Sequence, residues 1–177
     1  DDSASVVDLA SGSITTIPVG DAPGSVIVSP DGAFAVVGCG GDSTLHVINL
    51  ATLAVDRVIA SPGFTAQFSF GTESAAADYR YTTPLLFLDN TTLAFPARFD
   101  DIVAFIDVAT GSRNDLALTR TDPAGIDAVG TPVGTIMLVG HATDPGYVTV
   151  INADTQTELR SINTANTRAN GPVALNA

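Results

Sequence analysis

Residues 47–53 read VINLATL, an apolar run that passes through an asparagine into a short turn. Similar phrases read VVDLASG at residues 6–12, FIDVATG at residues 105–111 and VINADT at residues 150–155. The third residue of each phrase is an aspartate or asparagine, at positions 8, 49, 107 and 152, so that the intervals are 41, 58 and 45 residues. The chain therefore contains an internal repeat with a period close to the roughly 40 to 50 residues of a propeller blade.

A second motif lies between these phrases. Three segments of 14 residues align without a gap, and they read SVIVSPDGAFAVVG at 25–38, PLLFLDNTTLAFPA at 84–97 and DAVGTPVGTIMLVG at 127–140. Each consists of an apolar run, a turn rich in Pro, Gly, Asp or Asn, and a second apolar run, which predicts a β-hairpin. Together with the repeated phrase, each unit holds four strands, which we name A to D in chain order.

The predicted fold is all-β, a β-propeller of four-stranded antiparallel blades, with three complete blades and a partial blade at each end. The bounds predicted from the sequence are residues 3–19 for the C and D strands of a partial blade, 23–61, 84–118 and 125–163 for the three blades, 62–83 for a long D-to-A loop, and 171–176 for the A strand of a next blade. The apolar runs are continuous rather than alternating, as expected of strands covered on both faces. A β-sandwich or a β-solenoid is the alternative architecture.

The phrases APGSVIVSPDGAFAVV (22–37) and VINLATLAV (47–55) resemble the bacterial YVTN-type β-propeller repeat. That group is similar in turn to lactonase-like and amine-dehydrogenase heavy-chain-like propellers. The resemblance covers nearly the whole chain except residues 62–83, and it implies a ring of six to eight blades and a periplasmic or extracellular location. Because three blades leave such a ring open, we expect the remaining blades to come from the same chain, another subunit or another copy.

The composition excludes several partners. The formal net charge is -12, and all seven basic residues are arginines. An acidic chain without a basic cluster is not expected to bind nucleic acid or anionic membranes. No apolar run approaches the roughly 18 to 20 residues of a transmembrane helix, so none is expected. The single cysteine, Cys39, allows no disulfide within the chain.

Candidate binding residues gather where the D-to-A and B-to-C connections emerge, which is the end that carries the site in propeller enzymes. This end is predicted to hold Asp21, Cys39, Asp42, Arg98, Asp100, Asp101, Arg120, Asp122, His141, Asp144 and Arg168. The long loop 62–83 adds five of the eleven aromatic residues of the chain beside an arginine, a combination favoured at interfaces. The predicted binding residues are Phe64, Phe68, Phe70, Tyr79, Arg80, Tyr81, Arg98, Asp100 and His141. The alternative is that the phenylalanines of the loop fold back into the core.

The sequence predicts no catalytic residues, no metal site and no cofactor. Neither a Cys-x-x-Cys nor a His-x-x-x-His spacing is present, and calcium is the one cation that the Asp-rich turns would suit. Cys39 is either exposed at a turn or a small buried thiol. The predicted function is a non-catalytic scaffold or binding subunit for protein–protein or surface interaction in an exported assembly. The alternative is an enzyme or enzyme subunit of the lactonase-like or quinoprotein-dehydrogenase-like type, which would use Asp21 and Asp122 with His141 as base.

Overall fold

The computed structural model of the chain describes residues 1–61, 84–143 and 145–164, and its regular elements there are all β-strands. An N-terminal hairpin consists of β1 (Ser3–Val7) and β2 (Ile14–Pro18). Blade I consists of β3 (Pro23–Val28), β4 (Phe34–Cys39), β5 (Thr44–Asn49) and β6 (Ala54–Ala60). Blade II consists of β7 (Leu86–Phe87), β8 (Thr92–Ala97), β9 (Ile102–Asp107) and β10 (Arg113–Ala117). Blade III consists of β11 (Pro123–Thr131), β12 (Gly134–His141), β13 (Tyr147–Asn152) and β14 (Thr157–Asn163).

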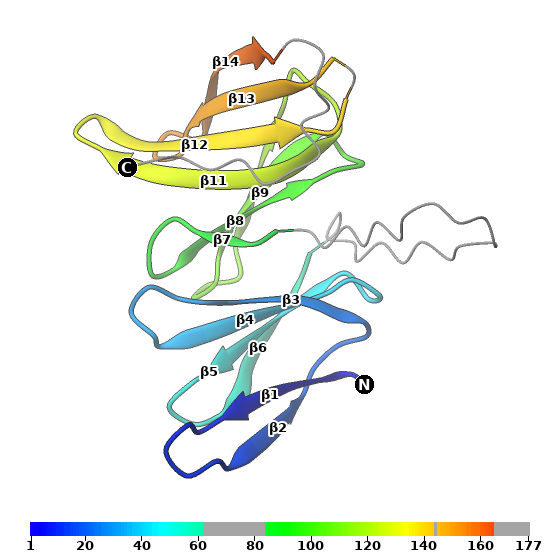
Figure 1. Ribbon diagram of the computed structural model, residues 1–177, viewed down its shortest axis with the longest axis vertical. Helices are drawn as coiled ribbons and strands as arrows, with labels where there is room; N and C mark the ends of the chain where they lie inside the picture. The colour runs from blue at the N-terminus through cyan, green and yellow to red at the C-terminus, as the bar shows by residue number, and fades with distance from the viewer. Residues whose placement is uncertain (62–83, 144, 165–177) are drawn as a thin grey trace, which may run out of the picture.

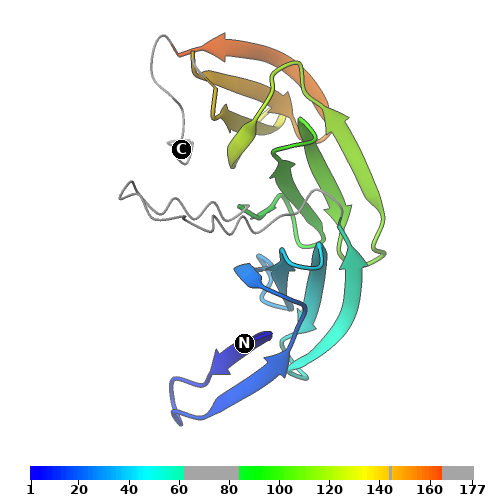
Figure 2. The same cartoon turned by 90° about the vertical axis from the view of Figure 1, so that its right-hand side faces the viewer.

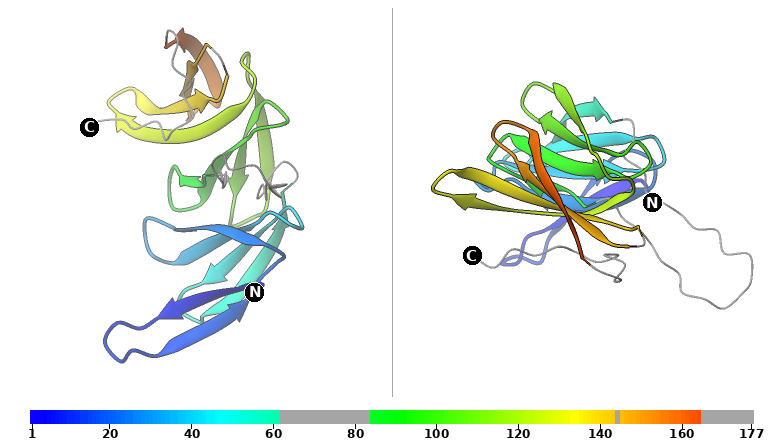
Figure 3. Two further views of the ribbon diagram at one scale, coloured as in Figure 1. Left: turned by 45° about the vertical axis from the view of Figure 1, so that its right-hand side comes forward. Right: turned by 90° about the horizontal axis from the view of Figure 1, so that it is seen from above.

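Each blade is an antiparallel sheet whose strands pair in chain order, which confirms the predicted four-stranded plan. The N-terminal hairpin and the three blades succeed one another in chain order, with the hairpin at one end of the row and blade III at the other (Figure 1). From the side the row bends into an arc (Figure 2), and the two further views show neighbouring sheets facing each other at an angle (Figure 3). Blades I and II therefore each offer one side to the preceding sheet and the other side to the next.

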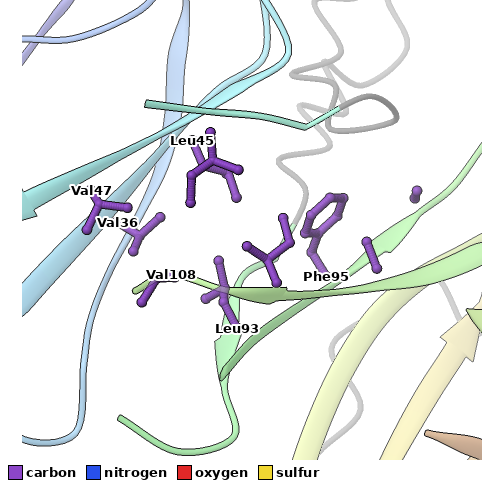
Figure 4. Packing of buried hydrophobic residues seen from close by; sticks show 10 residues of the cluster. Val36, Leu45, Val47, Leu93, Phe95 and Val108 are labelled. Atoms are coloured by element: carbon purple, nitrogen blue, oxygen red, sulfur yellow. The ribbon is translucent and has the colours of Figure 1, made fainter. Parts of the chain in front are cut away.

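The hydrophobic core is divided among the interfaces between neighbouring sheets. The cluster between blades I and II holds Val36, Leu45, Val47, Ile59, Leu93, Phe95, Ala97, Ala104, Ile106 and Val108 (Figure 4). The cluster between blades II and III holds Ala94, Val103, Phe105, Ile126, Met137, Val139, Ile151 and Ala153. The cluster between the N-terminal hairpin and blade I holds Ile17, Ala35, Val37, Cys39 and Ile48. Successive residues of β4 and β8 thus enter different clusters, which is why their apolar runs do not alternate.

The prediction that the three A–B hairpins align without a gap is wrong. In each blade, the isoleucine of the repeated phrase pairs with one residue of strand B, which is Ala35, Leu93 or Met137. That residue pairs in turn with a residue of strand A, which is Val28 in blade I, Phe87 in blade II and Ala128 in blade III. The connection is therefore one residue shorter in blade II than in blade I, and two residues longer in blade III. A slip of one residue turns every side chain of a strand to the other face. Val36 accordingly faces the next blade, whereas Phe95, which the gapless alignment equates with it, faces the preceding one.

The repeated aspartate or asparagine closes the C–D turn. The Oδ1 atom of Asp107 accepts hydrogen bonds from the backbone N–H groups of Ala109 (2.8 Å) and Thr110 (2.9 Å). Equivalent bonds are made by Asp8 to Ala10 and Ser11, by Asn49 to Ala51 and Thr52, and by Asn152 to Thr155. Short side chains that bond their own backbone in this way favour turns. The repeated phrase therefore serves to stabilise the C–D turn.

The fourth residue after this aspartate or asparagine lies in the left-handed region in all four turns. These residues are Gly12 (φ 72°), Leu53 (φ 52°), Gly111 (φ 79°) and Gln156 (φ 50°). A side chain at such a φ costs roughly 1–2 kcal/mol relative to glycine. Leu53 offsets this cost by packing against the cluster between the hairpin and blade I, and Gln156 by accepting a hydrogen bond from Asn114.

We expect Gly111→Ala to lower the free energy of unfolding by about 1 kcal/mol because of its positive φ alone. The nearest atom to an added Cβ is Ile59 Cγ1 at 3.8 Å, an ordinary contact, so no clash contributes. The matched control is Gly130→Ala in β11, where φ is not positive and nothing lies within 4 Å of an added Cβ. Urea unfolding of both variants checks the prediction, and equal free energies for the two would contradict it.

Candidate functional site

Arg98 links blade II to blade III at the end where the D-to-A and B-to-C connections meet. Its Nε lies 2.5 Å from Asp122 Oδ1, and its Nη2 donates to Oδ2 of the same carboxylate at 3.1 Å. The side chains are 24% and 33% exposed. The backbone N–H of Asp122 also donates to Asp101 Oδ1 at 2.8 Å. A bidentate ion pair of this kind holds both side chains in a fixed orientation, so Arg98 and Asp122 stabilise the contact between blades II and III.

In the B–C turn of blade I, the carboxylate of Asp42 also accepts a hydrogen bond from the backbone. Asp42 Oδ2 accepts from the N–H of Asp21 (3.2 Å), and Asp42 Oδ1 accepts from the hydroxyl of Thr44 (2.6 Å). The bond from Thr44 holds the pKa of Asp42 below its usual value. Asp100, in contrast, is exposed in the B–C turn of blade II. In the described parts of the chain, no three His, Cys, Asp or Glu side chains are grouped as metal ligands.

His141 is the last residue of β12 and its side chain is fully buried. Its Nδ1 lies 2.8 Å from the carbonyl oxygen of Thr121, and its Nε2 lies 2.8 Å from the hydroxyl of Thr149. A carbonyl only accepts, so the imidazole proton sits on Nδ1, and Nε2 accepts the Thr149 proton. The neutral ring is thus satisfied at both nitrogens, and burial lowers the pKa of His141.

The hydrogen-bonded network continues from His141 to a carboxylate. The Ser161 hydroxyl oxygen lies 3.0 Å from that of Thr149 and 3.0 Å from Glu158 Oε1. Because Thr149 gives its one proton to His141, the single proton of Ser161 bonds either Thr149 or Glu158 at a time. Glu158 also accepts from the backbone N–H of Thr119 (2.9 Å) and from its hydroxyl (2.5 Å), and the hydroxyl bond helps lower the pKa of Glu158. This network ties the D-to-A connection between blades II and III to β14, which gives His141 a structural role.

Cys39 is a buried thiol and not an exposed one. Its side chain is fully buried in the cluster between the N-terminal hairpin and blade I. Burial raises the pKa of the Cys39 thiol. Because the thiolate is the nucleophilic form, this environment disfavours reactivity.

A hollow of about 250 Å³ opens at the end of the blades that carries the D-to-A and B-to-C connections. It lies between the D-to-A connection of blades II and III and the B-to-C connection of blade III. It is lined by Thr119, Arg120, Thr121, Thr143, Pro145 and Tyr147. The guanidinium carbon of Arg120 lies 4.1 Å from the centroid of the Tyr147 ring, a cation–π contact. Arg120 is exposed and Tyr147 is half-buried, so the stacked pair is open to solvent.

A second hollow, of about 300 Å³, lies at the opposite end between blades II and III. Its carboxylates are engaged with the backbone: Asp89 Oδ1 accepts from the N–H groups of Thr91 and Thr92, and Asp154 Oδ2 accepts from that of Thr135. These backbone hydrogen bonds give both carboxylates a structural role.

Three of the predicted binding residues lie in the described part of the chain. Arg98 is paired with Asp122, both ring nitrogens of His141 are hydrogen-bonded, and Asp100 is exposed in the B–C turn of blade II. The remaining predicted residues lie outside the described part of the chain, namely Phe64, Phe68, Phe70, Tyr79, Arg80, Tyr81, Asp144, Arg168 and the strand predicted over 171–176. The sequence did not identify Tyr147 as a binding residue, because it lies within a strand, where a tyrosine that binds a partner cannot be told from one in the core.

No protein-family model and no curated protein matches the sequence. Solved structures of β-propeller proteins do match. Kuenenia stuttgartiensis hydrazine synthase is 23% identical with a TM-score of 0.54, over 86% of this chain and 45% of that one. The structure titled U3-55K is 17% identical with a TM-score of 0.58, over 90% of this chain and 45% of that one.

These similarities define the chain as part of a β-propeller, with three complete four-stranded blades and a partial one in its described residues. The chain spans 45% of the length of each of these two propeller chains. Within the described ranges, no helix has the length and apolar character needed to cross a membrane.

Proposed function

We propose that this chain is part of a non-catalytic β-propeller scaffold that binds a protein partner at the end carrying the D-to-A and B-to-C connections. The observation that supports this proposal is the solvent-open stack of Arg120 on Tyr147 beside a hollow. Tyrosine and arginine are the residue types most often found as binding anchors, particularly beside a small pocket. The hollow, at about 250 Å³, is below the roughly 300–1,000 Å³ of small-molecule sites, so it suits a side chain of a partner better than a cofactor.

The charge of the stack suggests the chemistry of the partner. Arg120 is one of seven basic residues in a chain of net charge -12, so its guanidinium is a local exception on an acidic surface. A carboxylate that approaches Arg120 forms charge-assisted hydrogen bonds, which are stronger than neutral ones. We therefore propose a partner that inserts an acidic side chain or a chain-terminal carboxylate beside Tyr147.

The enzyme hypothesis has less support, since two of the three groups it would use, His141 and Asp122, are engaged elsewhere. Both ring nitrogens of His141 are hydrogen-bonded in the core, and Asp122 is paired with Arg98. A general base must instead reach the proton that it removes from a substrate. We further propose that the protein belongs to the bacterial YVTN-type propeller group and acts in the periplasm or outside the cell, on the basis of the phrases at 22–37 and 47–55.

Affinity purification of the intact protein from its source, followed by quantitative mass spectrometry, tests the proposal. We expect Arg120→Ala and Tyr147→Ala each to weaken retention of one defined partner by about 10-fold or more, as for an anchor worth at least about 1.4–2 kcal/mol. The control is Val133→Ala, which removes an exposed side chain from the A–B turn of blade III, at the opposite end of the blade. Full retention by both variants would contradict the proposal, and turnover of lactones or amines by the intact protein would favour the enzyme hypothesis.

A further inference from the structure

Arg120 lies in the middle of an exposed segment that hydrogen bonds hold on both sides. On one side, the backbone N–H of Thr119 donates to Glu158 Oε2 at 2.9 Å, and the hydroxyl of Thr119 donates to Glu158 Oε1 at 2.5 Å. On the other side, the carbonyl oxygen of Thr121 accepts from Nδ1 of the buried His141 at 2.8 Å. Because the three residues of the segment are exposed, these bonds rather than burial fix the backbone around Arg120.

Side chains of blade III join the two groups that hold this segment. The hydroxyl of Thr149 donates to His141 Nε2 at 2.8 Å, and the hydroxyl oxygen of Ser161 lies 3.0 Å both from that of Thr149 and from Glu158 Oε1. Tyr147 belongs to the same sheet, since it pairs with His141 between β12 and β13. One hydrogen-bonded unit therefore holds both the tyrosine of the stack and the segment that carries the arginine.

Among the three blades that the structure describes, this network occurs only in blade III. Glu158 pairs with the isoleucine of the repeated phrase, and the residues in the same place are Val55 in blade I and Arg113 in blade II. The positions of Thr149 and His141 are taken by His46 and Cys39 in blade I, and by Ala104 and Ala97 in blade II. A feature that two blades lack is not needed to form a blade. It occurs where the sheet also carries the stack of Arg120 on Tyr147.

We propose that Glu158 is a positioning residue of the site formed by Arg120 and Tyr147. By holding Thr119, it keeps the guanidinium of Arg120 stacked on the tyrosine ring before a partner binds. A long side chain that is already fixed loses less freedom on binding, which strengthens the complex. Glu158 does not line the hollow, so it acts through Thr119 and not by touching the partner. This inference rests on the proposed function, in which Arg120 meets a carboxylate of the partner.

The charge of Glu158 would act in the opposite direction. A carboxylate near the hollow repels an acidic partner, so its removal would strengthen binding if charge were its main contribution. Its two oxygens already accept from the N–H and hydroxyl of Thr119, which offsets part of that repulsion. The positioning role and the repulsive role therefore predict opposite signs for the loss of Glu158, and a binding measurement separates them.

Nuclear magnetic resonance of the intact, full-length protein tests the positioning without a partner. The Nε–H signal of Arg120 reports the stack, because the ring current of Tyr147 shifts protons that lie over its face. We expect Glu158→Ala to remove this shift, so that the signal moves to the position that it has in Tyr147→Ala. The control is Gly111→Ala, which also destabilises the protein but lies in the C–D turn of blade II, and it should leave the signal in place. An unmoved signal in Glu158→Ala would overturn the inference.

A double-mutant cycle tests the link to binding, with retention of the partner that the native protein captures as the readout. We expect Glu158→Ala to weaken retention by about 3- to 10-fold, the order expected when one long side chain must be ordered on binding. In the Arg120→Ala background, Glu158→Ala should change retention by less than about 2-fold, because the two residues act as a unit. Equal losses in both backgrounds, or stronger retention by Glu158→Ala, would each overturn the inference.

Failure of this inference differs from failure of the proposed function. Full retention by Arg120→Ala and Tyr147→Ala contradicts the proposed function, whereas the signal of Arg120 still shows whether Glu158 positions it. If Glu158→Ala does not fold, Glu158→Gln serves in its place. It keeps the size of the side chain but turns an amide NH2 toward one of the two Thr119 donors, so the same shift and the same loss of retention are expected.

Discussion

Replacement of Phe95 by alanine is expected to lower the free energy of unfolding by about 3–5 kcal/mol, the range found for large aromatic side chains in cores. Phe95 is fully buried in β8 and lies in the cluster that joins blades I and II (Figure 4). Its ring also faces the guanidinium carbon of Arg113 at 5.7 Å, a cation–π contact that the substitution removes. The cavity would open at an interface between sheets, so both blades lose contacts.

Urea unfolding followed by circular dichroism measures this loss. The control is Phe99→Ala, which removes the same side chain from a turn where it is 61% exposed, and it should change stability by less than about 0.5 kcal/mol. If Phe95→Ala costs no more than Phe99→Ala, blades I and II do not share the core that the structure assigns to them.

Removal of the His141 imidazole is expected to have the second-largest effect. We expect His141→Leu to lower the free energy of unfolding at pH 8 by about 2–4 kcal/mol, because the carbonyl of Thr121 and the hydroxyl of Thr149 lose their partner in the core. Thr149→Val removes the bond to Nε2 and the contact with the Ser161 hydroxyl but keeps the bond from Nδ1 to Thr121, and it should cost about 1–2 kcal/mol. If the loss caused by His141→Leu is within error of zero, the network is not structural.

The same variant should change how stability depends on pH. Burial lowers the pKa of His141 from its ordinary value of 6.5, so the unfolded chain takes up a proton more readily than the folded one. The stabilisation from the neutral ring is therefore complete above pH 6.5 and is lost as the pH falls below that value toward the lowered pKa of the folded state. Unfolding midpoints at pH 8 and pH 5 should differ less in His141→Leu than in the native protein. The remaining dependence includes His46, whose pKa burial also lowers.

The sequence revealed only part of the candidate site, because a local pattern does not show which distant residues lie together in the fold. The sequence predicted which end of the blades holds the polar residues, and Arg120 is one of these residues. The residue that gives Arg120 its role is Tyr147, 27 positions away, and only the turn of the chain between blades II and III brings the two together. His141 was predicted to be available for binding because it ends a strand, yet the connection around Thr121 covers it.

The sequence by itself determined the four-stranded repeat and the turns between its strands. These features depend on contacts between near neighbours, such as the bonds from Asp107 to the N–H groups of the second and third residues after it. Only the tertiary structure decided which side of each strand faces which neighbouring sheet. The A–B hairpins of blades I and II differ in length, which a gapless alignment does not show. Val36 therefore faces the next blade, whereas Phe95, aligned with it, faces the preceding one. It also decided which polar residues are engaged in the fold: Arg98 and His141 are held by groups remote in sequence, whereas Arg120 is exposed and stacks on Tyr147. The burial of a polar side chain such as His141 is a property of the packed sheets, which its neighbours in the sequence do not determine.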